Sequence, residues 1–151
     1  MRVALGSDHA GYDLKCALVA TLRGWGHDVV DLGTQSGTES VDYPDFGAAV
    51  GHCVADGRAE LGVAVCGTGI GVSIAANKVP GVRAALAHDA TSARLAREHN
   101  HANVLCLGAR LIGLPVAVDA LEAWLSATPG EGRHLARVAM LTALDRLEQS
   151  Q

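Results

Sequence analysis

The hydrophobic positions of this chain form short apolar runs that alternate with stretches of helical periodicity. Continuous runs of β-branched and aliphatic residues predict buried strands, and apolar residues recurring every three or four positions predict helices with one buried face. The predicted strands are residues 2–6, 29–32, 61–65, 82–87 and 104–107. The predicted helices are residues 12–23, 45–55, a segment ending near 76, 91–98, 115–126 and 132–148.

Strands that alternate with helices are typical of a parallel sheet with right-handed crossover connections. We therefore expect a three-layer α/β/α domain of the Rossmann-like class, with a five-stranded parallel sheet and an additional C-terminal helix. A length of 151 residues suits one domain, which buries about 70% of the unfolded surface. Neither a repeat nor a linker interrupts the pattern, so residues 1–151 are predicted to form a single domain.

Composition narrows the class of protein. Hydrophobic residues make up 49% of the chain but aromatic residues only 3%, so the core must consist of Ala, Val and Leu, as in a helix-flanked parallel sheet. The net charge of −4 argues against nucleic acid or an anionic membrane as a partner. No apolar run approaches the ~20 residues of a membrane span. The cysteines lack CxxC spacing, which favours reduced thiols in a cytoplasmic protein.

The stretch VAVCGTGIGVSIAANK, residues 63–78, carries the strongest chemical signal. An apolar strand stops at Cys66, and Gly67, Gly69 and Gly71 precede small residues that suit a helix. Such a loop brings the N–H groups of a helix N-terminus close to a ligand, which favours an anion or an oxyanion. A thiol beside the same helix end is stabilised as a thiolate, which makes Cys66 a candidate base or nucleophile.

A structural turn and a buried cysteine are the alternatives for this loop. The pattern differs from the dinucleotide fingerprint, because Val72 stands where that motif has glycine or alanine. It differs from the phosphate-binding P-loop, because no Gly-Lys-Ser/Thr follows. Cys66 taken by itself is more often a small buried hydrophobic residue than a catalyst, so the loop alone leaves both interpretations open.

Ligands of parallel α/β sheets bind outside the carboxyl ends of the strands. Asp8 follows the first strand and is also a typical helix cap, but the adjacent His9 favours proton handling at this strand end. The same rule selects the loop after the third strand, a residue after the fifth strand and the loop before the second helix. The selected residues are Asp8, His9, Tyr43, Cys66 to Gly71 and Arg110.

His99 and Asn100 lie just before the fifth strand, at the opposite edge of the sheet. A five-residue strand spans about 17 Å, too far for their side chains to reach the carboxyl ends. Two interpretations remain open: the pair forms a C-cap of the preceding helix, or it contributes to the site of a neighbouring subunit. His99 and His101 have an HxH spacing, but no further ligands stand at a familiar distance, so no metal is expected.

The predicted C-terminal helix has an apolar stripe and carries Arg133 and Arg137 on one face near its N-terminal end. These two side chains repel each other and oppose the helix dipole, and each effect costs up to about 1 kcal/mol. A phosphate between the guanidinium groups would reverse that cost, because arginine binds phosphate through bidentate hydrogen bonds. A solvated charged face is the alternative.

Five blocks together resemble the ribose 5-phosphate isomerase type B family, which also contains galactose 6-phosphate and allose 6-phosphate isomerases. The blocks are GSDHAGYDLK, DYPDFG, VCGTGIGVSIAANK, EHNHANVLCLGAR and GRHLARV, and they cover nearly the whole chain. The resemblance implies the strand order 2-1-3-5-4 and an aldose–ketose isomerase that forms a cis-enediolate without a metal or other cofactor. It also implies a homodimer with shared active sites, which could pair into a tetramer, and a C-terminal helix packed on the partner subunit.

The resemblance also implies roles by position. Cys66 would be the base that moves a proton between C2 and C1 of the sugar. The backbone of residues 67–71 would hold the enediolate oxygens, and Thr68 would add a hydroxyl. His99 would open the furanose ring. Some family members use a glutamate further into the loop as the base, but that position looks to be Val72 here, which leaves Cys66 as the candidate.

Asp8 and His9 would bind the substrate and help to move oxygen-bound protons. Arg133 and Arg137 would bind chiefly the phosphate of the substrate. The other expected substrate contacts are Tyr43, Gly67, Thr68, Gly69, Ile70, Gly71, Asn100 and Arg110.

Three classes of function stay open at this stage. The first is the isomerisation of ribose 5-phosphate and ribulose 5-phosphate, or of a galactose, allose or tetrose phosphate. The second is a phosphosugar- or nucleotide-binding protein without turnover. The third is a thiol redox protein, which the lack of a resolving cysteine close to Cys66 in the sequence disfavours.

Overall fold

The computed structural model describes residues 1–149, which form one five-stranded sheet and six helices. The strands are β1 (Arg2–Ser7), β2 (Asp28–Asp31), β3 (Leu61–Cys66), β4 (Ala84–Leu86) and β5 (Val104–Gly108). The helices are α1 (Tyr12–Gly24), α2 (Tyr43–Ala55), α3 (Ile70–Asn77), α4 (Ala90–Asn100), α5 (Leu114–Ser126) and α6 (Arg133–Gln149). None of these helices is both long and apolar enough to cross a membrane.

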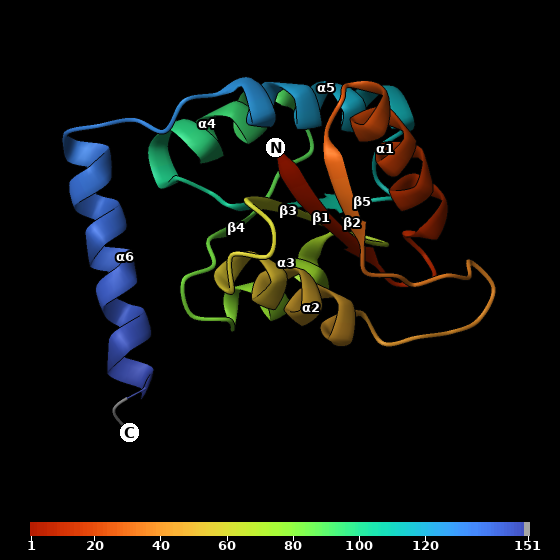
Figure 1. Cartoon of the computed structure of the whole chain (residues 1–151), viewed down its shortest axis with the longest axis horizontal. Helices are drawn as coiled ribbons and strands as arrows, with labels where there is room; N and C mark the ends of the chain where they lie inside the picture. The colour runs from red at the N-terminus through yellow and green to blue at the C-terminus, as the bar shows by residue number, and fades with distance from the viewer. Residues whose placement is uncertain (150–151) are drawn as a thin grey trace.

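Every neighbouring pair of strands is parallel, and the order across the sheet is β2-β1-β3-β5-β4. Figure 1 shows α1, α4 and α5 on one face of the sheet and α2 and α3 on the other, so the domain has three layers. The predicted α/β/α fold is confirmed, as is the strand order that the resemblance implied.

Side chains that alternate along each strand build two layers of core. Val63 and Leu105 belong to the layer beneath α1, α4 and α5, where the Trp124 side chain is fully buried. Ala64 and Val72 belong to the layer beneath α2 and α3. Because most of these side chains are small and aliphatic, the helices lie close to the sheet, and aromatic side chains are hardly needed to fill the core.

Two helix boundaries differ from the predicted ones at candidate site residues. α2 begins at Tyr43 rather than at residue 45, because Pro44 occupies the first turn, where a missing backbone N–H costs no hydrogen bond. α4 continues to Asn100, beyond the predicted end at residue 98. His101 then turns the chain with a left-handed φ of 48°, and the N–H of Ala102 donates to the carbonyl of Ala96.

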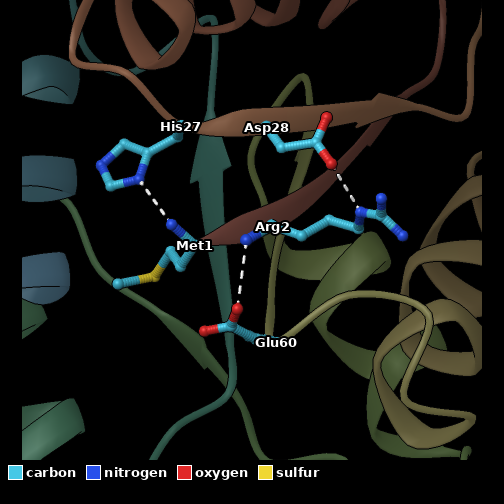
Figure 2. A network of polar contacts seen from close by, with 5 residues as sticks. All are labelled: Met1, Arg2, His27, Asp28 and Glu60. Atoms are coloured by element: carbon cyan, nitrogen blue, oxygen red, sulfur yellow. Dashed lines mark hydrogen bonds and ion pairs between the residues drawn. The ribbon is translucent and has the colours of Figure 1, made fainter.

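The amino ends of the neighbouring strands β2, β1 and β3 are tied together by polar contacts (Figure 2). The Arg2 Nε donates to Asp28 Oδ2 at 2.6 Å, which joins β1 to β2, and the Arg2 amide donates to Glu60 Oε1 at 3.3 Å, just before β3. The terminal amine of Met1 lies 3.5 Å from His27 Nδ1. These groups are exposed, so water screens each contact and it adds little to the stability of the fold.

The C-terminal helix α6 stands apart from the three layers, at the β4 edge of the sheet (Figure 1). It packs chiefly on α4, where Val138 is buried, and Asp145 accepts a hydrogen bond from the amide of Gly81 at 2.8 Å. The helix was predicted, but most of its apolar side chains are exposed in the single chain. The exposed ones include Leu135, Met140, Leu141, Leu144 and Leu147.

Candidate active site

The glycine loop after β3 turns back on the thiol that precedes it. Gly69 adopts a left-handed φ of 75° at the start of α3, and its amide donates a hydrogen bond to Cys66 Sγ at 3.2 Å. A side chain at Gly69 would bring a Cβ within 2.8 Å of the Leu107 carbonyl carbon. Glycine is therefore required there both for the backbone angle and for the close approach of β5.

The loop after β5 lies against the glycine loop. The Ala109 amide donates to the carbonyl of Cys66, and the Arg110 amide donates to the carbonyl of Gly67, both at 2.9 Å. These two bonds place the Arg110 guanidinium over Gly67, where a Cβ would lie only 3.1 Å from Nη1. One cation is thus fixed beside the thiol by backbone contacts.

The end of β1 contributes Asp8 and His9. The buried Asp8 carboxylate accepts a hydrogen bond from the Gly11 amide at 3.0 Å, in the turn that leads into α1, and Asp8 also lines the cavity described below. His9 Nδ1 accepts from the Val41 amide at 3.2 Å. Because Nδ1 is an acceptor, the neutral His9 ring carries its proton on Nε2.

These groups line one cavity of about 460 Å³. The Cys66 side chain is only 5% exposed, and the Tyr43 ring packs on Gly71, where a Cβ would lie within 2.5 Å of the ring. The cavity thus brings together a thiol, an imidazole, a carboxylate, a guanidinium and the amides of a helix start. Nine predicted site residues line it: Asp8, His9, Tyr43, Cys66, Gly67, Thr68, Ile70, Gly71 and Arg110.

Gly69 belongs to the same loop without lining the cavity, and the other four predicted site residues lie elsewhere in the single chain. His99 and Asn100 end α4, and Arg133 and Arg137 are in the first turns of α6. Figure 1 shows both helix ends away from the carboxyl ends of the central strands, as the length of β5 requires. Asn100 instead lines a separate hollow of about 400 Å³ between α6 and β4.

Two ring contacts at the α4–α6 junction were not predicted from the sequence. The rings of His99 and His134 stack with centroids 4.4 Å apart and an interplanar angle of 4°. His101 Nε2 lies 2.6 Å from the Gly130 carbonyl oxygen. The two histidines of the HxH spacing therefore have separate partners. Within residues 1–149 no group of three or more His, Cys, Asp or Glu side chains is placed to hold a metal ion.

The surroundings of His134 at this junction disfavour its charged form. Partial burial lowers the pKa of His134, and the neighbouring charges of His99, Arg133, Arg137 and His101 lower it further. His134 is therefore neutral at neutral pH.

A buried ion pair between α1 and β2 was also missed. Lys15 Nζ is 2.6 Å from Asp31 Oδ1, and the Lys15 side chain is fully buried. The same oxygen of Asp31 accepts from the Gly33 amide at 3.0 Å. Gly33 in turn accepts from the Ser7 amide, which fixes the start of the 33–41 loop beside β1. A lysine inside the apolar stripe of α1, next to Leu14, is the signal that could have revealed this pair.

Two further residues bear on the chemistry of the thiol. Val72 is fully buried in the core below the loop, so its position offers no acid or base to the cavity. Cys106 is also fully buried, and burial followed by the nearby Cys66 raises the pKa of its thiol far above the usual range. Cys106 stays protonated, so it is a poor partner for disulfide exchange with Cys66.

Known proteins resemble this chain over nearly its whole length. A family model described as Ribose/Galactose Isomerase matches residues 3–141. The ribose-5-phosphate isomerase B of Escherichia coli (strain K12) is 44% identical over 145 residues, which are 96% of this chain and 97% of that protein. The D-erythrulose-4-phosphate isomerase of Pectobacterium atrosepticum is 38% identical over 151 residues, which are 100% of this chain and 99% of that protein. A structure of Clostridium thermocellum ribose-5-phosphate isomerase B has a TM-score of 0.96 at 47% identity, with 98% of this chain and 99% of that chain covered.

Proposed function

The chain belongs to the ribose/galactose isomerase family and is a sugar-phosphate isomerase, and we propose that it interconverts ribose 5-phosphate and ribulose 5-phosphate. The observation that carries this proposal is the position of the Cys66 thiol. Its sulfur lines the same cavity as Asp8 and His9 and accepts a hydrogen bond from the Gly69 amide at the start of α3. A thiolate in that position is a base beside a set of oxyanion donors.

The proposed reaction is a proton transfer between adjacent carbons of the open-chain sugar. The Cys66 thiolate takes the proton from C2 of the aldose, and the electron pair of that C–H bond forms the double bond of a cis-enediolate. The thiol then returns the proton to C1, which leaves the carbonyl at C2. Amides of residues 67–71 and the Thr68 hydroxyl hold the two oxygens, and donors of this kind lower barriers by roughly 3 to 4 kcal/mol each in other enzymes.

The oxygen-bound protons need their own carriers. The proton on O2 of the aldose must reach O1 as the double bond moves. His9 has one ring nitrogen occupied by the Val41 amide, so its Nε2–H is the group left to bind a sugar oxygen. Asp8 shares the same wall of the cavity. We assign substrate binding and oxygen-bound proton transfer to this pair, and we assign substrate contacts to Tyr43 and Arg110.

The complete site is proposed to form between two copies of the chain. His99 would open the furanose ring, and Asn100, Arg133 and Arg137 would bind the substrate, the two arginines chiefly through its phosphate. None of the four lines the Cys66 cavity of its own chain. The exposed apolar side chains of α6 support a homodimer in which α6 lies on the partner subunit. The four unpaired cysteines suit the cytoplasmic location that we also propose.

A tetrose phosphate is the second candidate substrate. It is favoured by the 38% identity to D-erythrulose-4-phosphate isomerase over 100% of this chain. The experiment that decides the substrate offers the purified protein ribose 5-phosphate, allose 6-phosphate, galactose 6-phosphate and erythrose 4-phosphate, and measures the rate of ketose formation. The highest kcat/KM is expected with ribose 5-phosphate, and adding a chelator should leave the rate unchanged. Binding of all four sugars without ketose formation would contradict the proposal.

A further inference from the structure

The junction between α4 and α6 is built around the stacked pair of His99 and His134. The two imidazole planes are nearly parallel, at 4°, and the centroids are 4.4 Å apart. His99 is the penultimate residue of α4, and His134 is the second residue of α6. The stack therefore joins two helix ends that are far apart in the sequence and side by side in the fold (Figure 1).

Gly130 holds the two helix ends at this spacing. Its amide donates to the carbonyl of Glu98 at 2.8 Å, and its carbonyl accepts from His101 Nε2 at 2.6 Å. A Cβ on Gly130 would lie 2.7 Å from the Glu98 oxygen and 3.0 Å from Cδ2 of His134. The His134 ring thus contacts both Gly130 and the His99 ring, which leaves it little freedom to turn.

The last turn of a helix frays more readily than its middle, and a side chain there needs support if it is to hold one orientation. His99 obtains that support from the parallel ring of His134. We propose that His134 is a positioning residue that holds the imidazole of His99 in the orientation needed to open the sugar ring. This inference rests on the proposed function, in which His99 opens the furanose ring.

The charge around His134 is compatible with that role. Burial and then the charges of His99, Arg133, Arg137 and His101 lower the pKa of His134. The one acidic side chain nearby on α4, Glu98, is paired with Arg94 at 2.7 Å. A neutral ring at position 134 lets His99 gain a proton during catalysis without a second cation stacked against it.

A double-mutant cycle on the full chain tests the proposal, with ribose 5-phosphate as the substrate. We compare His99→Gln, His134→Ala, His134→Phe and the double variant His99→Gln/His134→Ala. His134→Ala should lower kcat about tenfold with little change in KM, because a misplaced catalytic group slows the reaction more than it weakens binding. His134→Phe keeps a flat ring in the stack and should retain kcat within about twofold.

The double variant separates positioning from other roles. If His134 acts through His99, its removal should cost nothing further once His99 is glutamine. A second readout is an NMR titration, in which His99→Gln should raise the pKa of His134 by removing one neighbouring charge. Circular dichroism melts identify any variant whose loss reflects unfolding, and His134→Phe then carries the test.

Three results would overturn the inference. One is a His134→Ala enzyme that works like the wild type while His99→Gln is impaired. Another is an effect of His134→Ala that persists undiminished in the His99→Gln background, which would indicate a direct contact with the substrate. The third is a His134→Phe variant as impaired as His134→Ala. If His99→Gln itself keeps full activity, the role given to His99 in the proposed function fails instead, and the inference falls with it.

Discussion

The amide of Gly69 donates a hydrogen bond to the sulfur of Cys66 at 3.2 Å. Gly69 has a left-handed φ of 75°, so the chain turns into α3 directly after this N–H. The bond fixes the sulfur at the cavity end of β3, beside the first amides of α3.

Replacing Cys66 by alanine should abolish isomerisation while the sugar phosphate still binds. The substitution removes the proposed base, and a general base contributes about 10²- to 10⁴-fold to a rate. It removes no group that faces the phosphate. Turnover is measured by ketose formation, and binding of ribulose 5-phosphate by calorimetry.

Cys66→Ser is the matched control for this prediction. It keeps the size and a hydrogen-bond acceptor for the Gly69 amide, but a serine hydroxyl is a far weaker acid than a thiol and supplies no anion near neutral pH. It should therefore be nearly as slow as Cys66→Ala. Wild-type turnover by the Cys66→Ala variant would refute the proposal that Cys66 is the base.

Gly71→Ala should raise the KM for the sugar phosphate several-fold and leave stability within about 1 kcal/mol. A Cβ at this position would meet the Tyr43 ring at 2.5 Å. The Tyr43 side chain is 44% exposed, so the ring can swing away into solvent, and the cavity then loses one wall. Alanine is also the better helix former, which offsets part of the clash.

Gly24→Ala is the control for that substitution. Gly24 ends α1, and nothing lies within 4 Å of a Cβ built there. It should leave KM unchanged and raise the melting temperature slightly. Steady-state kinetics and thermal melts of the two variants check both statements, and an unchanged KM in Gly71→Ala would show that the Tyr43 wall is dispensable.

The cavity could be predicted because its parts follow local signals. Asp8, Cys66 and Arg110 each lie at the end of an apolar strand or within two residues of it, and parallel strands bring such positions to one edge. The turn after β3 could be predicted from its glycines, because Gly69 adopts a positive φ that other residues rarely adopt. The positions of Asp8, Cys66 and Arg110 therefore follow from the pattern of strands alone, and that pattern is clear in this chain.

The α4–α6 junction could not be predicted in the same way. His99 and His134 are brought together by the path of residues 101–132, and no spacing or period in the sequence encodes a contact across that distance. The Lys15–Asp31 ion pair could not be predicted for the same reason. Lys15 can be recognised as buried and paired only once the position of β2, which carries Asp31, is known. Nonlocal contacts of this kind follow from tertiary packing, which residue patterns do not specify.

The two partners of the buried ion pair should contribute unequally to stability. Asp31→Ala leaves the fully buried Lys15 ammonium without its counter-charge, and should cost about 3 to 5 kcal/mol. Lys15→Met fills the same space with an apolar chain. It leaves Asp31, whose side chain is 27% exposed, with water and the Gly33 amide, so it should cost less than about 1.5 kcal/mol. Urea denaturation measures both, and equal losses would contradict the asymmetry.

Asp89 should make the stability of the protein sensitive to acid. Its carboxylate accepts from the Ser92 amide and then from the Ser92 hydroxyl at the start of α4, and these bonds hold the pKa of Asp89 below its ordinary value. Because the folded pKa is the lower one, the stabilisation is complete above the ordinary pKa and is lost as the pH falls through the folded pKa.

Asp89→Asn isolates that contribution. Asparagine still accepts the Ser92 amide but carries no charge, so its cap does not depend on pH. The difference in unfolding free energy between the wild type and Asp89→Asn should therefore be largest near pH 6 and shrink toward about pH 3. Urea denaturation at several pH values measures it, and a difference that stays constant with pH would contradict the prediction.

A site shared between two subunits makes a prediction that no single-chain site makes. Cys66→Ala and His99→Gln subunits, co-expressed with different affinity tags and purified as the mixed dimer, should recover about half of the wild-type kcat per dimer, since one of the two sites then has both residues intact. The reciprocal dimer pairs a wild-type subunit with a Cys66→Ala/His99→Gln subunit. Each of its sites lacks one of the two residues, so its activity should stay near that of the single variants. If instead the reciprocal dimer is half active and the first is not, His99 serves the Cys66 of its own chain, and the shared site is wrong.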